Sequence, residues 1–178
     1  PSPDNRAGGR LAIEHLLACG RSRIAHVSGD PTYAAARERL EGARAALADA
    51  GLDFVGEPLS GDWSEHWGRD AASTLLTRHP DIDAIFAASD QIARGVLDTA
   101  RDLGRTVPDD LAVIGYDNWE LLATNSRPEL TSIDANLQQL GRRAAQHVFE
   151  AIDGSTRESG IRNLPVRLVI RGSTVARR

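Results

Sequence analysis

Four short segments of the sequence combine a carboxylate with hydroxyl, amide or aromatic side chains: residues 29–33, 61–63, 89–91 and 116–119. Each holds one aspartate and follows a run with strand character. Carboxylates and amides bind the hydroxyls of a sugar, and a flat ring covers its apolar C–H face. In open parallel sheets such loops meet outside the carboxyl ends of the strands. The four segments therefore predict a binding site for a small polar ligand such as a sugar.

Individual residues in these segments have two competing interpretations. An Asp or Ser in such a position is often a helix N-cap, and we favour that role for Asp30 and Asp90. We favour ligand contact for Asp117 and Trp63, because neither directly opens a clear helix. Arg39 lies about two turns into the helix after the first loop, where its guanidinium could donate a planar fork to a diol or carboxylate.

Other chemistries lack their motifs. The sequence has no G-x-x-x-x-G-K-[ST], no H-E-x-x-H and no G-x-S-x-G. The loop aspartates could hold a divalent metal, as in a phospho-receiver, but each would come from a different strand end. We predict no catalytic residue, no metal and no cofactor, with an α/β enzyme or phospho-receiver as a remaining alternative.

Composition limits the partners. The chain has 178 residues, 41% of them hydrophobic and 26% charged, with a formal net charge of −4. An acidic balance argues against binding nucleic acid through these residues alone. The single cysteine, Cys19, excludes an internal disulfide. No apolar run is long enough for a membrane span, and the first residues lack the pattern of a secretion signal, so we expect no membrane contact and a cytoplasmic location.

Hydrophobic patterning predicts alternating strands and helices. Strands are expected at 24–28, 54–59, 84–88 and 111–115, with a short extended piece at 130–133 and a terminal edge strand over 164–170. Helices are expected over 36–50, after Ser64 and over 92–103, with Gly51 and Gly104 as C-caps. Trp67 and Trp119 are expected to pack in the interior. This alternation predicts an α/β fold, with helices on both faces of a parallel sheet in a three-layer sandwich.

Several segments together resemble regulators of the LacI/GalR family. They are GRLAIEHLL at 9–17 with GRSRIA at 20–25, RERLEG at 37–42, AASDQIARG at 87–95, VPDDLAVIGYDN at 107–118 and PELTSI at 128–133. They follow the family order over nearly the whole chain. Two positions depart from the family pattern: Arg21 stands where His is usual, and Ser89 where Asn is usual. The second departure shortens the reach of a hydrogen bond to the ligand.

The resemblance implies the effector-sensing domain of a sugar-responsive repressor, with a periplasmic-binding-protein-like type I lobe. Such a regulator is a homodimer that binds a small effector between two lobes and operator DNA through a helix-turn-helix headpiece. The residues that would contact the effector are Arg39, Asp117, Trp63, Ser89 and Tyr33, with Asp90 and Asp62 as secondary candidates. A solute-binding protein of a sugar ABC transporter is the main alternative, because it shares the lobe.

The resemblance also implies how the chain is divided. Residues 23–134 and 162–174 would form the C-terminal lobe. The helices within 4–22 and 135–161 would belong to an N-terminal lobe, whose strands, like the headpiece, would lie upstream of Pro1. We therefore expect both helices to expose apolar faces. Helix 91–103 and the loop 120–127 are expected to transmit the response through the dimer face.

Overall fold

The computed structural model of the chain describes residues 1–154, 160 and 162–175. Its centre is a six-stranded sheet with the strand order β3-β2-β4-β5-β6-β8. The strands are β2 (Ile24–Ser28), β3 (Leu59–Ser60), β4 (Ala84–Ala87), β5 (Ala112–Tyr116), β6 (Thr131–Asp134) and β8 (Arg167–Val169). The first five run parallel, and β8 is an antiparallel edge strand beside β6. The predicted α/β fold with a parallel sheet is confirmed.

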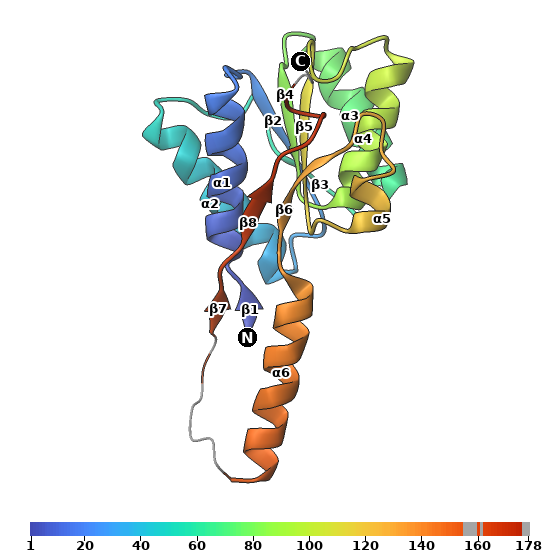
Figure 1. The fold of residues 1–178 in the computed structure, drawn as a ribbon. Coiled ribbons are helices and arrows are strands. Elements are labelled where there is room, and N and C mark those ends of the chain that lie inside the picture. Colours follow the sequence, from blue (N-terminus) through green and yellow to red (C-terminus); the bar gives the residue numbers. More distant parts are fainter. Residues whose placement is uncertain (155–159, 161, 176–178) are drawn as a thin grey trace.

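Helices cover both faces of this sheet (Figure 1). One face carries α1 (Asn5–Ala18) and α2 (Ala34–Asp49), and the other carries α3 (Glu65–Arg78), α4 (Asp90–Asp102) and the short α5 (Glu120–Ala123). Strand β4 shows how the two cores are built, because Ala84 and Phe86 pack with α1 and α2, while Ile85 and Ala87 pack with α3 and α4. Alternate residues of a buried strand thus supply opposite faces.

Local signals set most helix ends. The Ser64 hydroxyl caps α3 by accepting a hydrogen bond from the Trp67 N–H, as expected. Gly51 and Gly104 follow α2 and α4 with φ of 70° and 69°, a conformation that glycine adopts at little cost. The strand expected over 54–59 is only partly right, since β3 covers Leu59–Ser60 alone. Gly56 has a φ of 69°, which interrupts the extended backbone before β3.

The first helix does not need a missing partner, contrary to our expectation. Ala12, Ile13 and Leu16 of α1 are fully buried in the core shared with α2 and the sheet. Helices α1 and α2 lie very close, because a Cβ atom on Gly9 would be only 2.0 Å from the Arg39 carbonyl oxygen. The apolar face of α1 packs on strands that lie far from it in sequence, which short-range patterning could not reveal.

The last helix, α6 (Leu137–Ile152), projects away from this body (Figure 1). None of its residues is buried, and Leu137, Val148, Phe149 and Ile152 are exposed, so the exposed apolar face expected for this helix is observed. The expected terminal strand divides in two: β8 joins the main sheet, whereas β7 (Asn163–Leu164) pairs with β1 (Ser2–Pro3). Residues 155–159 and 161 of the expected segment 135–161 lie outside the described residues.

Candidate ligand-binding site

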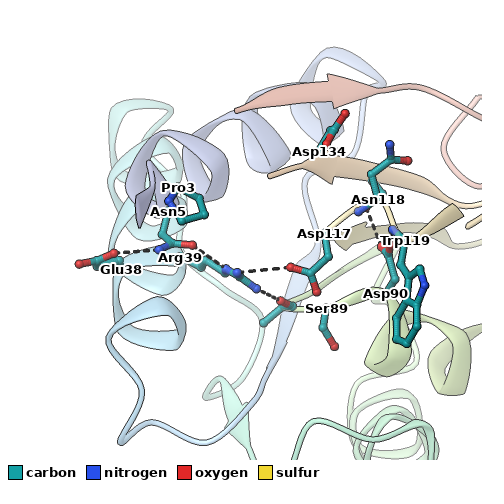
Figure 2. Close-up of polar contacts among 12 residues, drawn as sticks. Pro3, Asn5, Glu38, Arg39, Ser89, Asp90, Asp117, Asn118, Trp119 and Asp134 are labelled. Carbon is teal, nitrogen blue, oxygen red and sulfur yellow. Dashed lines mark hydrogen bonds and ion pairs between the residues drawn. The ribbon is translucent and has the colours of Figure 1, made fainter. Parts of the chain in front are cut away.

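The predicted site residues lie around the carboxyl edge of the sheet, where β2, β4 and β5 end. Tyr33 and Arg39 come from the start of α2, Trp63 from the loop before α3, Ser89 from the start of α4 and Asp117 from the turn after β5. Figure 2 shows Arg39, Ser89 and Asp117 together in this region. The convergence of loops from separate strands is confirmed for these three residues.

Arg39 is the centre of the polar contacts and is only 7% exposed. Its Nε donates to Asn5 Oδ1 at 3.0 Å, and its Nη1 donates to the Ala88 carbonyl oxygen at 2.5 Å. Its Nη2 faces Asp117 Oδ1 at 3.5 Å (Figure 2). The guanidinium carbon lies 3.6 Å from the centre of the Tyr116 ring. Because the buried guanidinium has a partner on each nitrogen, its orientation is fixed.

Asp117 has an unusual backbone and a partly open side chain. Its φ is 104°, and Asn118 follows with a φ of 52°, so two non-glycine residues form a left-handed corner. Burial raises the pKa of Asp117 to about 6, and the Arg39 guanidinium counteracts part of that rise. Its side chain is 32% exposed, which leaves carboxylate oxygen available to a hydroxyl of a ligand.

Trp63 and Tyr33 provide aromatic surface beside Arg39. Their rings meet edge to face, with centroids 6.1 Å apart, and the guanidinium carbon of Arg39 lies 5.8 Å from the Trp63 ring. The Trp63 ring packs on Gly29, where an added Cβ would lie 2.3 Å from it. Tyr33 is 58% exposed. The Trp63 ring, which packs on Gly29, lies near the buried guanidinium of Arg39, and the exposed ring of Tyr33 lies against Trp63.

Ser89 is buried, and its hydroxyl accepts a hydrogen bond from the Ile92 N–H as the N-cap of α4. Among the described residues no protein acceptor is found for the proton of that hydroxyl, and ligand contact by Ser89 stays a prediction.

Two other loop aspartates serve their own loops. Asp30 accepts hydrogen bonds from the N–H and hydroxyl of Thr32. The N-cap of α2 is Tyr33, so the cap predicted at Asp30 is wrong; the carboxylate is used in a turn before the helix starts. Asp62 is exposed and accepts from the Ser64 hydroxyl at 2.5 Å.

Asp90 is not an N-cap either, because Ser89 takes that role. Asp90 is the first residue of α4 and is 1% exposed. Its Oδ1 accepts from the Ser132 hydroxyl at 2.6 Å, and its Oδ2 accepts from the Trp119 N–H at 2.7 Å. Burial raises the pKa of Asp90 to about 7. Both oxygens face inward, so Asp90 is poorly placed to touch a ligand.

The two tryptophans expected in the interior differ. Trp67 packs against Gly61 and donates its indole N–H to the Ser28 carbonyl oxygen at 2.8 Å, which confirms the expectation. Trp119 is 52% exposed, so the expectation is wrong for this residue. Its position is set by its backbone N–H on Asp90 rather than by its ring.

A cavity of about 700 Å³ opens on the other side of the left-handed corner, between α5, the start of α6 and β8. It is lined by Asp117, Asn118, Trp119, Glu120, Thr124, Asp134, Asn136, Leu137, Gln138, Arg167 and Arg171. Asp117 is the predicted contact residue in this lining, so its carboxylate joins the Arg39 cluster to a polar cavity.

Sequence reasoning missed three contributors to the site. Asn5 lies 34 residues before Arg39 and belongs to no recognisable motif. Tyr116 precedes Asp117, and its burial under the guanidinium follows from its place on the inward side of β5, which the strand alternation could have indicated. Ser132 appeared only as part of a strand, because nothing nearby in sequence marks it as a partner of Asp90.

A metal-binding group and a membrane-spanning helix are both absent from the part of the chain that the structure describes. No group of three or more His, Cys, Asp or Glu residues there could hold a metal ion. Among the same residues, no helix has the length and apolar character needed to cross a bilayer.

Comparisons with known proteins agree with this architecture. A family model for the periplasmic binding protein-like domain matches residues 13–174. The HTH-type transcriptional regulator CelR of Thermobifida fusca is 40% identical over 168 residues, which are 94% of this chain and 47% of that protein. The ribose operon repressor of Escherichia coli (strain K12) is 37% identical over 167 residues, 93% of this chain and 50% of the repressor. The chain thus spans about half the length of these relatives, which are named as a transcriptional regulator and a repressor.

Solved structures give the same result. The complex of the transcriptional regulator CelR with cellobiose matches with a TM-score of 0.91 and 38% identity, covering 96% of this chain and 52% of that chain. The Lac repressor dimer bound to operator and the anti-inducer ONPF matches with a TM-score of 0.87 and 30% identity, covering 98% and 52% respectively. The fold therefore agrees over nearly all of this chain.

Proposed function

We propose that this chain, which belongs to the periplasmic binding protein-like domain family, is the effector-sensing part of a sugar-responsive transcription regulator. In this proposal a sugar binds at the carboxyl edge of the sheet, against Arg39, Asp117, Trp63, Ser89 and Tyr33. The named relatives are regulators, which favours this function over a transporter's solute-binding protein.

The observation that carries the proposal is the pairing of a buried guanidinium with a partly open carboxylate. Arg39 has a protein partner on each of its three nitrogens and contacts Asp117 on one side, while the Asp117 side chain remains 32% exposed. A sugar hydroxyl can donate to that carboxylate in a charge-assisted hydrogen bond, and the ring of Tyr33 or Trp63 can cover its C–H face.

The remaining partners lie outside these residues in this proposal. The exposed apolar face of α6 packs on a second lobe, which also supplies the other wall of the ligand cleft. Operator DNA is bound by a separate headpiece, since the net charge of −4 gives this chain little affinity for phosphates. The regulator works as a cytoplasmic homodimer without catalysis, and the sugar shifts the population of its DNA-binding state.

Calorimetric titration with cellobiose, ribose and further mono- and disaccharides tests the proposal. We expect at least one sugar to bind, and Asp117→Ala to weaken that binding by about tenfold or more, the cost of a lost hydrogen bond to a charged group. Asp53→Ala is the matched control, because within the described part of the chain the Asp53 carboxylate accepts a hydrogen bond from the neighbouring Phe54 N–H and contacts none of the proposed site residues. Equal sugar affinity in Asp117→Ala and the unsubstituted chain would contradict the assignment.

A further inference from the structure

Asp90 has a buried carboxylate whose role is explained neither by capping nor by ligand contact. Its two oxygens accept hydrogen bonds from two different elements, one from the Ser132 hydroxyl in β6 and one from the Trp119 N–H in front of α5. Strand β5 leaves room for it, because a Cβ on Gly115 would lie 2.4 Å from Asp90 Oδ1. The carboxylate therefore lies where α4, β5 and β6 meet.

The Ser132 hydroxyl extends this contact to a second backbone amide. A hydroxyl has one proton, and Ser132 donates it to Asp90 at 2.6 Å. The same oxygen accepts from the Asn118 N–H at 3.0 Å. Asp90 thus holds the Trp119 amide directly and the Asn118 amide through Ser132.

These two amides directly follow Asp117, whose own N–H donates to the Ile133 carbonyl oxygen at 2.8 Å. Left-handed backbone at two consecutive non-glycine residues costs free energy and persists only where the surroundings hold it. Three successive amides, at 117, 118 and 119, are held, and two of the three depend on Asp90.

We propose that Asp90 is a positioning residue: through Ser132 and the Trp119 amide it holds the left-handed corner that directs the Asp117 carboxylate toward Arg39 and the ligand. This inference rests on the proposed function for its link to sugar binding. The link to the orientation of Asp117 can be tested without a ligand.

An ionised carboxylate suits this role because both of its partners donate. An amide at this position would present an NH2 group to one of the two donors and lose that contact. The charged groups that face Asp90 are Asp117, which opposes its ionisation, and Arg171, which favours it and whose Nη2 binds Asn118 Oδ1 at 2.8 Å.

Ser132→Ala is the decisive variant, because it removes the link to Asn118 without changing any charge. Amide hydrogen exchange and the ¹³C titration of the Asp117 carboxyl are measured by NMR, and cellobiose binding by calorimetry. We expect the Asn118 amide to exchange about tenfold faster. We also expect the pKa of Asp117 to fall toward that of an exposed aspartate, and cellobiose affinity to fall severalfold.

Matched controls separate positioning from general stability. Ser173→Ala removes another fully buried serine hydroxyl, which lies in the turn after β8, accepts from the Thr131 N–H and donates to the Val113 carbonyl oxygen. A second variant, Asp90→Asn, should change the same three measurements in the same direction, because it loses one of the two contacts of Asp90. Asp83→Asn is its control, since Asp83 accepts from two backbone amides, those of Ser22 and Arg23. Both controls should leave the Asn118 exchange rate, the Asp117 titration and cellobiose affinity unchanged.

The Asp117 titration decides the proposal. An unchanged midpoint in Ser132→Ala, or an equal shift in Ser173→Ala, would overturn it. If the unsubstituted chain bound neither cellobiose nor any other sugar tested, the proposed function would fail, whereas a shifted Asp117 midpoint confined to Ser132→Ala would still support the positioning role.

Discussion

The two edges of the central sheet stabilise their buried polar groups in opposite ways. At the carboxyl edge, Arg39, Asp117 and Asp90 are ionisable groups grouped around a left-handed corner. At the amino edge, the buried polar groups include the hydroxyls of Ser173, Thr174 and Thr131. The buried charged side chains Arg39 and Asp90 and the left-handed corner lie where the loops converge, at the edge that is expected to bind the ligand.

The amino edge joins the C-terminal segment to the sheet. The Ser173 hydroxyl donates to the Val113 carbonyl oxygen at 2.6 Å and accepts from the Thr131 N–H at 2.8 Å. The Thr174 hydroxyl lies 2.8 Å from that of Thr131 and 2.7 Å from His15 Nε2. Each hydroxyl has protein partners, so this edge contributes to stability and has little polar capacity left for a ligand.

The largest contrast should come from removing one guanidinium at each edge. Arg39→Ala leaves Asp117, Asn5 and a buried carbonyl without their donor, so we expect the free energy of unfolding to fall by about 3 kcal/mol and sugar binding to be lost. Arg105→Ala is the control, because Arg105 binds only backbone carbonyl oxygens at the amino edge and should cost about 1 kcal/mol. Urea unfolding and calorimetry measure both effects. Similar losses of stability in the two variants would remove the contrast.

A smaller change separates stability from binding. Ser173→Ala leaves the Thr131 N–H and the Val113 carbonyl oxygen buried without their hydroxyl partner, which should cost about 2 kcal/mol of stability. Sugar affinity below the unfolding transition should not change, because the hydrogen bonds of the Ser173 hydroxyl among the described residues go to Thr131 and Val113, and not to Asp117 or to the amides of its corner. Reduced affinity at a temperature where the variant is fully folded would show that the edges are coupled.

The same contrast explains what the sequence could reveal. The strands, most helix ends and the capping of α3 follow from periodicity, glycines and Ser64, all of which are local signals. The placement of Arg39, Ser89 and Asp117 at one edge also follows, because parallel topology brings successive loops together.

The contacts that complete the site depend on residues distant in sequence. The contact between Asn5 and Arg39, or between Asp90 and Ser132, is made by side chains that no spacing rule connects. The helix α1 was misplaced for the same reason, since its apolar face meets strands that no short window includes. Local patterning cannot distinguish an aspartate that caps a helix from one that binds a neighbouring loop, which is why the cap expected at Asp90 was wrong.

The smallest effect is a difference in pH dependence between one aspartate from each edge. Burial raises the pKa of Asp117 to about 6, so its contribution to stability is fully present below about pH 4 and is lost as the pH rises through about 6. At the amino edge, the hydrogen bond from the Thr106 N–H lowers the pKa of Asp110, so its contribution is present above about pH 4 and is lost as the pH falls.

Urea unfolding between about pH 3 and pH 8 can compare the unsubstituted chain with Asp117→Asn and Asp110→Asn. We define the stability difference as the free energy of unfolding of the unsubstituted chain minus that of the variant. This difference should decrease with rising pH for Asp117→Asn and increase with rising pH for Asp110→Asn. If the stability difference changed with pH in the same direction for both variants, the two edges would not differ in how they stabilise a carboxylate.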